Sequence, residues 1–228
     1  MNNVYTLAGA VVIAGIMISG AIIYSNTIQN DNDREAKVAD ESSENNEDDG
    51  ARSIDIDIEG WPKRGDIDAP VVIVEYSDYV CPFSKRLKDE TISRIKENYV
   101  NEGRVLLVYK DLPVVGGDRA AEAAHCAGEQ NAFWEYHEML YENQANHRGS
   151  WNDPEIHGRY AEDLGLDADE LVECFEERRY RDKVLGSARE AQSLGGRGTP
   201  FVIVNGRSVS GAQPYEVFRR LIEEGLEG

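Results

Sequence analysis

The sequence predicts an α/β domain, because two aliphatic strands flank an amphipathic helix. Residues Val71–Val74 are β-branched at every position, which is typical of a strand buried on both faces of a helix-covered sheet. A helix is predicted over Pro82–Asn98 from apolar residues at roughly helical spacing: Phe83, Leu87, Ile92, Ile95 and Tyr99. A second strand is expected at Arg104–Tyr109. Strand, helix and strand in this order form a right-handed parallel unit.

Residues 1–25 are predicted to form a transmembrane anchor. No charge occurs from Val4 to Tyr24, and a helix of this length is about 31 Å long, enough to cross a bilayer core. A cleaved signal peptide is the alternative, with a weak cleavage candidate at Ser19-Gly20-Ala21. The long apolar core and the absence of a preceding Lys or Arg favour an uncleaved single-pass anchor.

Residues 26–52 are predicted to be an acidic, disordered linker. Between Asp31 and Asp49 nine acids stand against two bases, and few aliphatic side chains are available to bury. An acidic binding tail is the alternative interpretation. The net charge of −19, from 24 basic and 43 acidic residues, argues against nucleic-acid binding by the domain.

Residues 53–228 are predicted to form the folded domain. It begins with an edge strand, because Ile54, Ile56 and Ile58 alternate with acids before Trp61-Pro62. Four or five short helices are expected between Asp118 and Leu194. Their candidate caps are Asp118, Asp153 with Pro154, Gly165 and Asp167.

A hairpin and a helix are expected to close the domain. Phe201–Val204 and Ser208–Ser210 flank an Asn205-Gly206 turn, and Asn-Gly favours the two-residue turns of hairpins. The closing helix is predicted over Pro214–Glu224.

Cys81 is the candidate nucleophile of this domain. Ser77–Val80 reads as a turn after the first strand, and Pro82 suits the first position of a helix, so Cys81 falls at the N-cap. Free backbone N–H groups at that position favour a thiolate, and we expect an exposed, activated thiol. The alternative is a small buried apolar residue, the common role of a free cysteine.

Three stretches resemble the DsbA-like branch of the thioredoxin superfamily. They are EYSDYVCPFSKR around Cys81, GTPFVIVNGR from Gly198 to Arg207, and AAEAAHCAGEQNAFWEYHEMLYENQ from Ala120 to Gln144. The resemblance implies a thioredoxin fold with an inserted α-helical domain at about 113–196. The usual motif is Cys-Pro-aromatic-Cys, and here Ser84 replaces the second cysteine.

The same resemblance implies the site residues. Cys81, Pro82, Phe83 and Ser84 form the motif, Thr199 and Pro200 form the cis-proline loop, and Glu75 corresponds to a buried acid of the family. A hydrogen bond from Ser84 to the thiolate is expected. No cofactor is expected, and the four histidines lack the spacing of a metal site.

Cys126 and Cys174 are expected to form a structural disulfide. Both lie on apolar faces of predicted helices, and members of the resembled family carry a cysteine pair in these segments. In an exported protein such cysteines are typically oxidised. Two unpaired buried thiols are the alternative.

The predicted function is membrane-tethered, extracytoplasmic thiol-disulfide exchange through a single motif cysteine, of oxidoreductase or isomerase type. The expected partners are exported polypeptides with thiols or disulfides, together with a redox protein or small thiol that resolves the adduct, because Ser84 cannot. One alternative is a redox-degenerate chaperone or scaffold that binds extended polypeptide. Another is a kappa-class glutathione transferase, although that class has Ser where this chain has Cys81.

Overall fold

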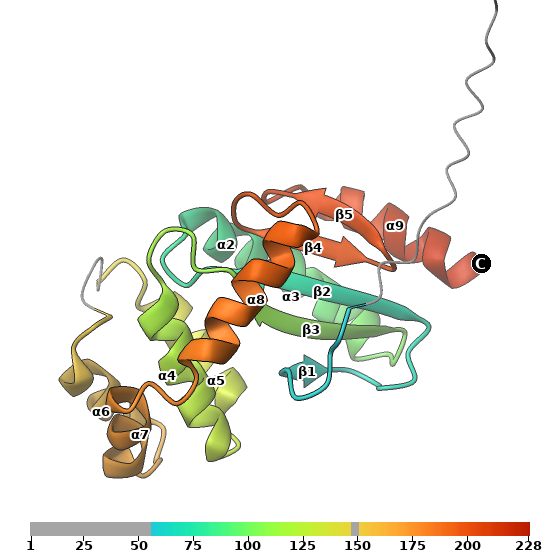
Figure 1. The fold of residues 1–228 in the computed structure, drawn as a ribbon. Coiled ribbons are helices and arrows are strands. Elements are labelled where there is room, and N and C mark those ends of the chain that lie inside the picture. Colours follow the sequence, from blue (N-terminus) through green and yellow to red (C-terminus); the bar gives the residue numbers. More distant parts are fainter. Residues whose placement is uncertain (1–55, 147–150) are drawn as a thin grey trace, which may run out of the picture. The chain divides into compact units, whose positions relative to one another are not determined.

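The structure, a computed structural model of the chain, describes residues 56–146 and 151–228 (Figure 1). The predicted anchor, residues 1–25, and the predicted linker, residues 26–52, lie outside these residues. Within the described ranges, no helix combines the length and the apolar character needed to cross a bilayer.

A five-stranded mixed sheet forms the centre of the described domain. Its strands are β1 (Lys63–Arg64), β2 (Val71–Ser77), β3 (Val105–Asp111), β4 (Phe201–Val204) and β5 (Arg207–Ser210). They lie in the order β1-β3-β2-β4-β5. β2 and β3 are parallel, with Val71 opposite Val105, and the other pairs are antiparallel. The central β2 is buried along almost its whole length, as its β-branched sequence predicts.

The edge strand was predicted at the wrong place. Ile56 and Ile58 are not in a strand but are partly buried against one face of the sheet, and this packing explains their alternation with acids. The short β1 pairs with β3 instead. The predicted turn also begins too early, because β2 continues through Ser77, and β3 runs two residues past Tyr109 to Asp111.

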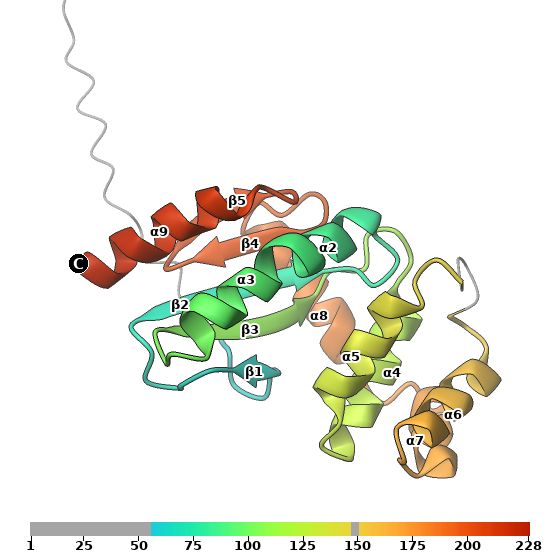
Figure 2. The same cartoon turned by 180° about the vertical axis from the view of Figure 1, so that it is seen from behind.

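One continuous helical run carries Cys81 at its start. It consists of α2 (Pro82–Leu87), the π-helical turn η1 (Lys88–Ile92), α3 (Ser93–Ile95) and the π-helical turn η2 (Lys96–Val100). It therefore ends two residues beyond the predicted Asn98. With α9 (Tyr215–Glu227), which follows the N-cap Pro214, it covers one face of the sheet (Figure 2). α8 (Arg181–Ser193) lies on the other face (Figure 1).

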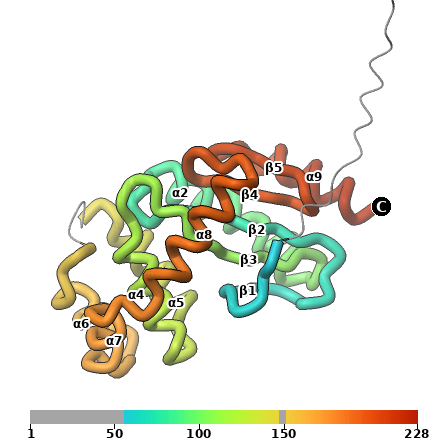
Figure 3. The backbone as a smooth tube through the Cα atoms, viewed as in Figure 1, coloured from blue at the N-terminus to red at the C-terminus, as the bar shows by residue number. Residues whose placement is uncertain are grey.

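Four more helices precede α8 in the described chain between β3 and β4: α4 (Asp118–Glu129), α5 (Phe133–Glu142), α6 (Pro154–Asp163) and α7 (Ala168–Glu176). The path can be followed in Figure 3, where the chain leaves the sheet after β3 and returns through α8 to β4. Asp153 and Asp167 cap α6 and α7 as predicted, and Gly165 follows α6 with a φ of 70°. The N-cap of α4 is Gly117 rather than Asp118.

Gly117 stands at that cap because the chain passes very close to a carboxylate. A Cβ atom on this residue would collide with Oδ1 of Asp78, in the turn after β2. Only a glycine allows this approach, so the start of the helical insertion is held against the turn that precedes Cys81.

A disulfide between Cys126 and Cys174 joins α4 to α7, as predicted from the sequence. Both cysteines are buried in a cluster with the apolar side chains of the insertion. The insertion thus has a core of its own, beside the two that pack on either face of the sheet.

Candidate active site

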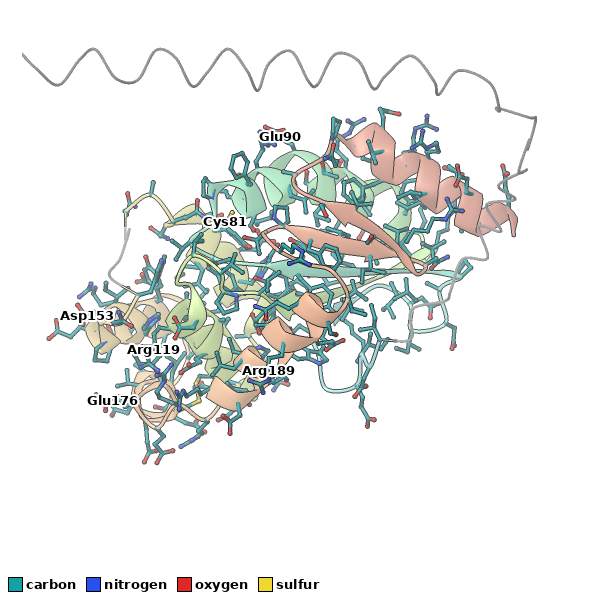
Figure 4. All side chains as sticks on the ribbon, turned by 45° about the horizontal axis from the view of Figure 1, so that its top comes forward. Cys81, Glu90, Arg119, Asp153, Glu176 and Arg189 are labelled. Carbon is teal, nitrogen blue, oxygen red and sulfur yellow. A yellow bond between two sulfur atoms is a disulfide. The ribbon has the colours of Figure 1, made fainter. Side chains whose placement is uncertain are left out.

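Cys81 lies at the N-cap of α2, with Pro82 as the first helical residue, as the sequence predicts. Its backbone N–H donates to the Asp78 carbonyl oxygen at 3.0 Å. Figure 4 shows Cys81 at the start of the helix and Glu90 further along it. The prediction of an exposed thiol is wrong, because Cys81 is only 5% exposed. Only a small part of the thiol is therefore accessible to a partner from solvent.

The loop before β4 covers the Cys81 thiol. Its Thr199–Pro200 peptide bond is cis, as expected from the resemblance, and Sγ of Cys81 donates to the Thr199 carbonyl oxygen at 3.3 Å. This contact between residues 118 positions apart is what buries the thiol. In the described structure, Oγ1 of Thr199 is buried without a hydrogen-bond partner.

Ser84 is fully buried one helical turn from Cys81. Its hydroxyl accepts a hydrogen bond from the Asp78 backbone N–H at 3.3 Å. This bond helps to close the turn over the helix start, and it leaves the hydroxyl hydrogen of Ser84 available as a donor. In contrast, Phe83 is 54% exposed and points away from this buried side.

Glu75 is a buried acid on β2, as expected from the resemblance. Its carboxylate accepts a hydrogen bond from the Ser77 hydroxyl at 2.6 Å. Burial raises the pKa of Glu75 from 4.5 to about 7, while the Ser77 bond and the Lys88 charge oppose the rise. Lys88 itself pairs with Glu138 at 2.6 Å and with Asp89 at 3.2 Å, so its charge is not available to Glu75 alone.

A small cleft of about 180 Å³ reaches Glu75 from the side of the insertion. Lys88 and Glu138 line it together with Arg64, Lys96 and His137. The cleft therefore places charged and polar side chains next to the buried carboxyl.

Two polar residues that sequence reasoning missed, Asp78 and Gln144, hold the turn before Cys81. The Asp78 carboxylate accepts from the backbone N–H groups of Val80 and Val115, both at 2.8 Å. The side-chain amide of Gln144 donates to the carbonyl oxygens of Tyr79 and Cys81, at 2.7 and 3.0 Å. Apart from the local bond between Asp78 and Val80, these partners are distant in sequence, so no local pattern marks them.

A groove of about 770 Å³ lies between the helical run and the β5–α9 loop, and its wall includes Thr199, the residue that contacts the Cys81 thiol. Its walls carry the exposed Phe83 ring, Arg86 and Thr199. The rest of the lining comes from Leu87, Glu90, Thr91, Gly211, Ala212, Gln213 and Pro214. The mixture of apolar surface and backbone groups suits an extended polypeptide.

Three histidines have structural partners. His125 bonds Asp111 at 2.7 Å, His137 bonds the Tyr79 hydroxyl at 3.0 Å, and His157 bonds the Tyr136 hydroxyl at 2.7 Å. In residues 56–146 and 151–228 no three potential ligands come together as a metal site would require.

Comparison with known proteins agrees with this geometry. The model of a protein family described as thioredoxin matches residues 59–224. The chain belongs to this thioredoxin family. It is 27% identical over 176 residues to disulfide bond formation protein D of Bacillus subtilis, covering 75% of this chain and 79% of that protein. The crystal structure of oxidised BdbD from Bacillus subtilis has a TM-score of 0.70 at 26% identity, covering 75% of this chain and 96% of that one.

A second relative is much longer than this thioredoxin-family chain. The Na(+)/H(+) antiporter NhaA 3 of Salinispora tropica is 35% identical over 158 residues, which are 68% of this chain and 22% of the antiporter. The chain thus spans about a fifth of that protein. The matches to the thioredoxin family model, to disulfide bond formation protein D and to BdbD make the chain a DsbA-like member of the thioredoxin family.

Proposed function

We propose that this protein catalyses thiol-disulfide exchange on protein disulfides through Cys81 alone. The observation that carries the proposal is the position of Cys81 at a helix N-terminus against the Thr199 carbonyl, with no second thiol available. The sequence has three cysteines, and Cys126 and Cys174 are bonded to each other. The motif therefore has no resolving thiol of its own.

The reaction proceeds in two exchanges. The Cys81 thiolate attacks one sulfur of a substrate disulfide, forms a mixed disulfide and releases the other substrate sulfur as a thiolate, which takes up a proton. A second thiolate then attacks the substrate sulfur of the mixed disulfide and regenerates Cys81. If that thiolate belongs to the substrate, the substrate disulfide is isomerised. If it belongs to a small thiol or a redox protein, the substrate leaves as a mixed disulfide with that thiol. A further thiolate of the small thiol or redox protein then attacks the sulfur of the first, which forms a disulfide between these two sulfurs and releases the reduced substrate.

The groove beside Cys81 supports a polypeptide substrate. An extended chain lying in it passes the exposed Phe83 ring on one side and the Thr199 loop on the other. Backbone groups give affinity without requiring a particular sequence, and the apolar wall selects unfolded segments. These features favour substrates whose disulfides are still being formed or rearranged.

Residues 1–25 are proposed to anchor the domain to a membrane, with residues 26–52 as its linker and the domain on the extracytoplasmic side. The uncharged stretch from Val4 to Tyr24 supports the anchor. The Cys126–Cys174 disulfide supports an oxidising compartment, where such bonds persist. Exported polypeptides are the substrates that this location would offer.

Trapping of mixed disulfides tests the proposal. The full chain, incubated with a peptide that contains a disulfide, should accumulate an adduct on Cys81 that a small thiol removes. Cys81→Ala should abolish the adduct.

A second function, binding of extended polypeptide without redox turnover, rests on the same groove and on the burial of Cys81. It replaces the first if no adduct forms while Cys81→Ala still binds the peptide.

A further inference from the structure

The main chain at Cys81 is held by a side chain of the helical insertion. Gln144 lies in the turn directly after α5 and is 9% exposed. Its Nε2 donates to the carbonyl oxygens of Tyr79 and Cys81, 65 and 63 residues earlier in the chain. Both partners are acceptors, so the NH₂ group must face them, and its two hydrogens serve one carbonyl each.

These two bonds complete a set of constraints on the Cys81 backbone. The Cys81 N–H donates to the Asp78 carbonyl at 3.0 Å, and the Cys81 carbonyl also accepts from the Lys85 N–H at 3.2 Å. The Lys85 bond forms the first turn of α2. The Gln144 bonds hold two other carbonyl groups in place, that of Tyr79 before the N-cap residue and that of Cys81 itself. Sγ is thereby placed against the Thr199 carbonyl, 3.3 Å away.

The position of Sγ matters because it changes partner during the reaction. When Cys81 loses its proton to become the attacking thiolate, its sulfur no longer donates to Thr199, and one constraint on the residue is lost until the thiol is restored. The bonds from Gln144 do not involve the sulfur, so they persist through both exchanges. They keep the leaving sulfur beside the free N–H groups of the helix, where a thiolate is favoured.

We propose that Gln144 is a positioning residue for thiol-disulfide exchange, which holds the Cys81 main chain so that the thiolate forms and re-forms at the N-terminus of α2. The inference rests on the proposed function. It also assigns the insertion a part in the reaction, because the geometry of the nucleophile depends on a side chain that the thioredoxin core does not supply.

The test compares Gln144→Met, which keeps the length of the side chain and removes both donors, with Gln144→Ala. Gln130→Met is the matched control. Like Gln144, Gln130 makes two side-chain hydrogen bonds to the main chain, but both go to Asp167, at 3.0 and 2.8 Å, within the insertion and away from the turn before Cys81. Alkylation of Cys81 by iodoacetamide is measured in the full chain across pH, and mixed-disulfide formation with a disulfide peptide is measured at neutral pH.

Both Gln144 variants should move the midpoint of alkylation to higher pH and slow mixed-disulfide formation about tenfold, the effect of losing buried hydrogen bonds that orient the nucleophile. Gln130→Met should match the wild type. A Gln144→Met protein whose midpoint and rate stay within about twofold of the wild type would overturn the proposal and leave Gln144 a packing role.

Two further results keep the test decisive. Gln144→Glu, whose ionised form faces both carbonyls with oxygens, should be slower still than Gln144→Met in protein that circular dichroism shows to be folded; equal rates would count against the proposal. Alkylation needs no disulfide substrate, so it tests the role of Gln144 separately from the exchange function. If the wild type forms no adduct but the alkylation midpoint of the Gln144 variants is shifted, the exchange function is refuted and the role of Gln144 in placing the thiol is not.

Discussion

Replacing Glu75 by Gln should stabilise the protein at alkaline pH and leave it unchanged in acid. Burial raises the pKa of this carboxyl from 4.5 to about 7 in the folded state, whereas the unfolded chain ionises near 4.5. Between these pH values the folded protein holds a proton that the unfolded chain releases. The stability associated with the neutral carboxyl is complete below pH 4.5 and is lost as the pH rises through about 7. The pKa difference corresponds to about 3 kcal/mol at pH 8.

A Gln at this position has the same shape, accepts the Ser77 hydroxyl bond with its carbonyl oxygen and carries no charge. For a chain of this size about 3 kcal/mol is worth about 6–12 °C in melting temperature. We expect Glu75→Gln to melt higher than the wild type by that amount at pH 8, and the two to converge at pH 4. Circular dichroism melts over this pH range measure both.

Glu97→Gln is the control, because it removes the same charge from an exposed position on the helical run. Its melting temperature should follow that of the wild type at each pH. If Glu75→Gln is no more stable than the wild type at pH 8, the ionised carboxylate is compensated in the folded protein, by Lys88 or by water in the cleft, and the reasoning from burial fails.

Three other changes test separate parts of the molecule. Replacing Cys126 and Cys174 together by Ala should lower the free energy of unfolding by roughly 4 kcal/mol, the value that the chain-entropy model gives for a cross-link spanning 48 residues. The alkylation rate of Cys81 should not change, and equal denaturation midpoints of the variant and the wild type would contradict the prediction. Ser84→Cys should form a motif disulfide with Cys81 and gain dithiol turnover, and free motif thiols after oxidation would argue against it. Phe83→Ala should weaken binding of a disulfide peptide about fivefold at unchanged thermal stability, so unchanged affinity would remove Phe83 from the binding surface.

The strands were predictable where apolar side chains define them, and less so where buried polar residues continue them. β2 runs on past the apolar Val71–Val74 through Glu75, Tyr76 and Ser77, and so includes the first residue of the predicted turn. Tyr76 remains buried because its hydroxyl donates to Glu190, 114 residues later. Lys110 in β3 pairs with the same carboxylate at 2.6 Å. Such partners belong to the tertiary structure, and no local window of sequence contains them.

The features of the site were likewise predictable where local sequence defines them and not where they depend on distant residues. Cys81 at the N-cap follows from local rules, since Pro82 fixes the start of the helix. The burial of its thiol depends on Thr199, and the orientation of its main chain depends on Gln144. The bond that Ser84 accepts from the Asp78 backbone N–H is a further contact that the motif spacing does not predict. The spacing of the motif residues identifies the chemistry of the site, and contacts with residues distant in sequence decide how accessible the Cys81 thiol is.

The π-helical turn at Lys88–Ile92 holds about one residue more than a turn of regular α-helix does. The apolar positions Leu87 and Ile92 are five apart, and on a regular α-helix they would point in clearly different directions; the wider turn brings both into the same core. Deleting the exposed Glu90 would convert this turn to ordinary α-helix while Cys81 stays at its tip and Ile95 stays in the core. The run can therefore vary in length by one residue between its reactive end and its packed end.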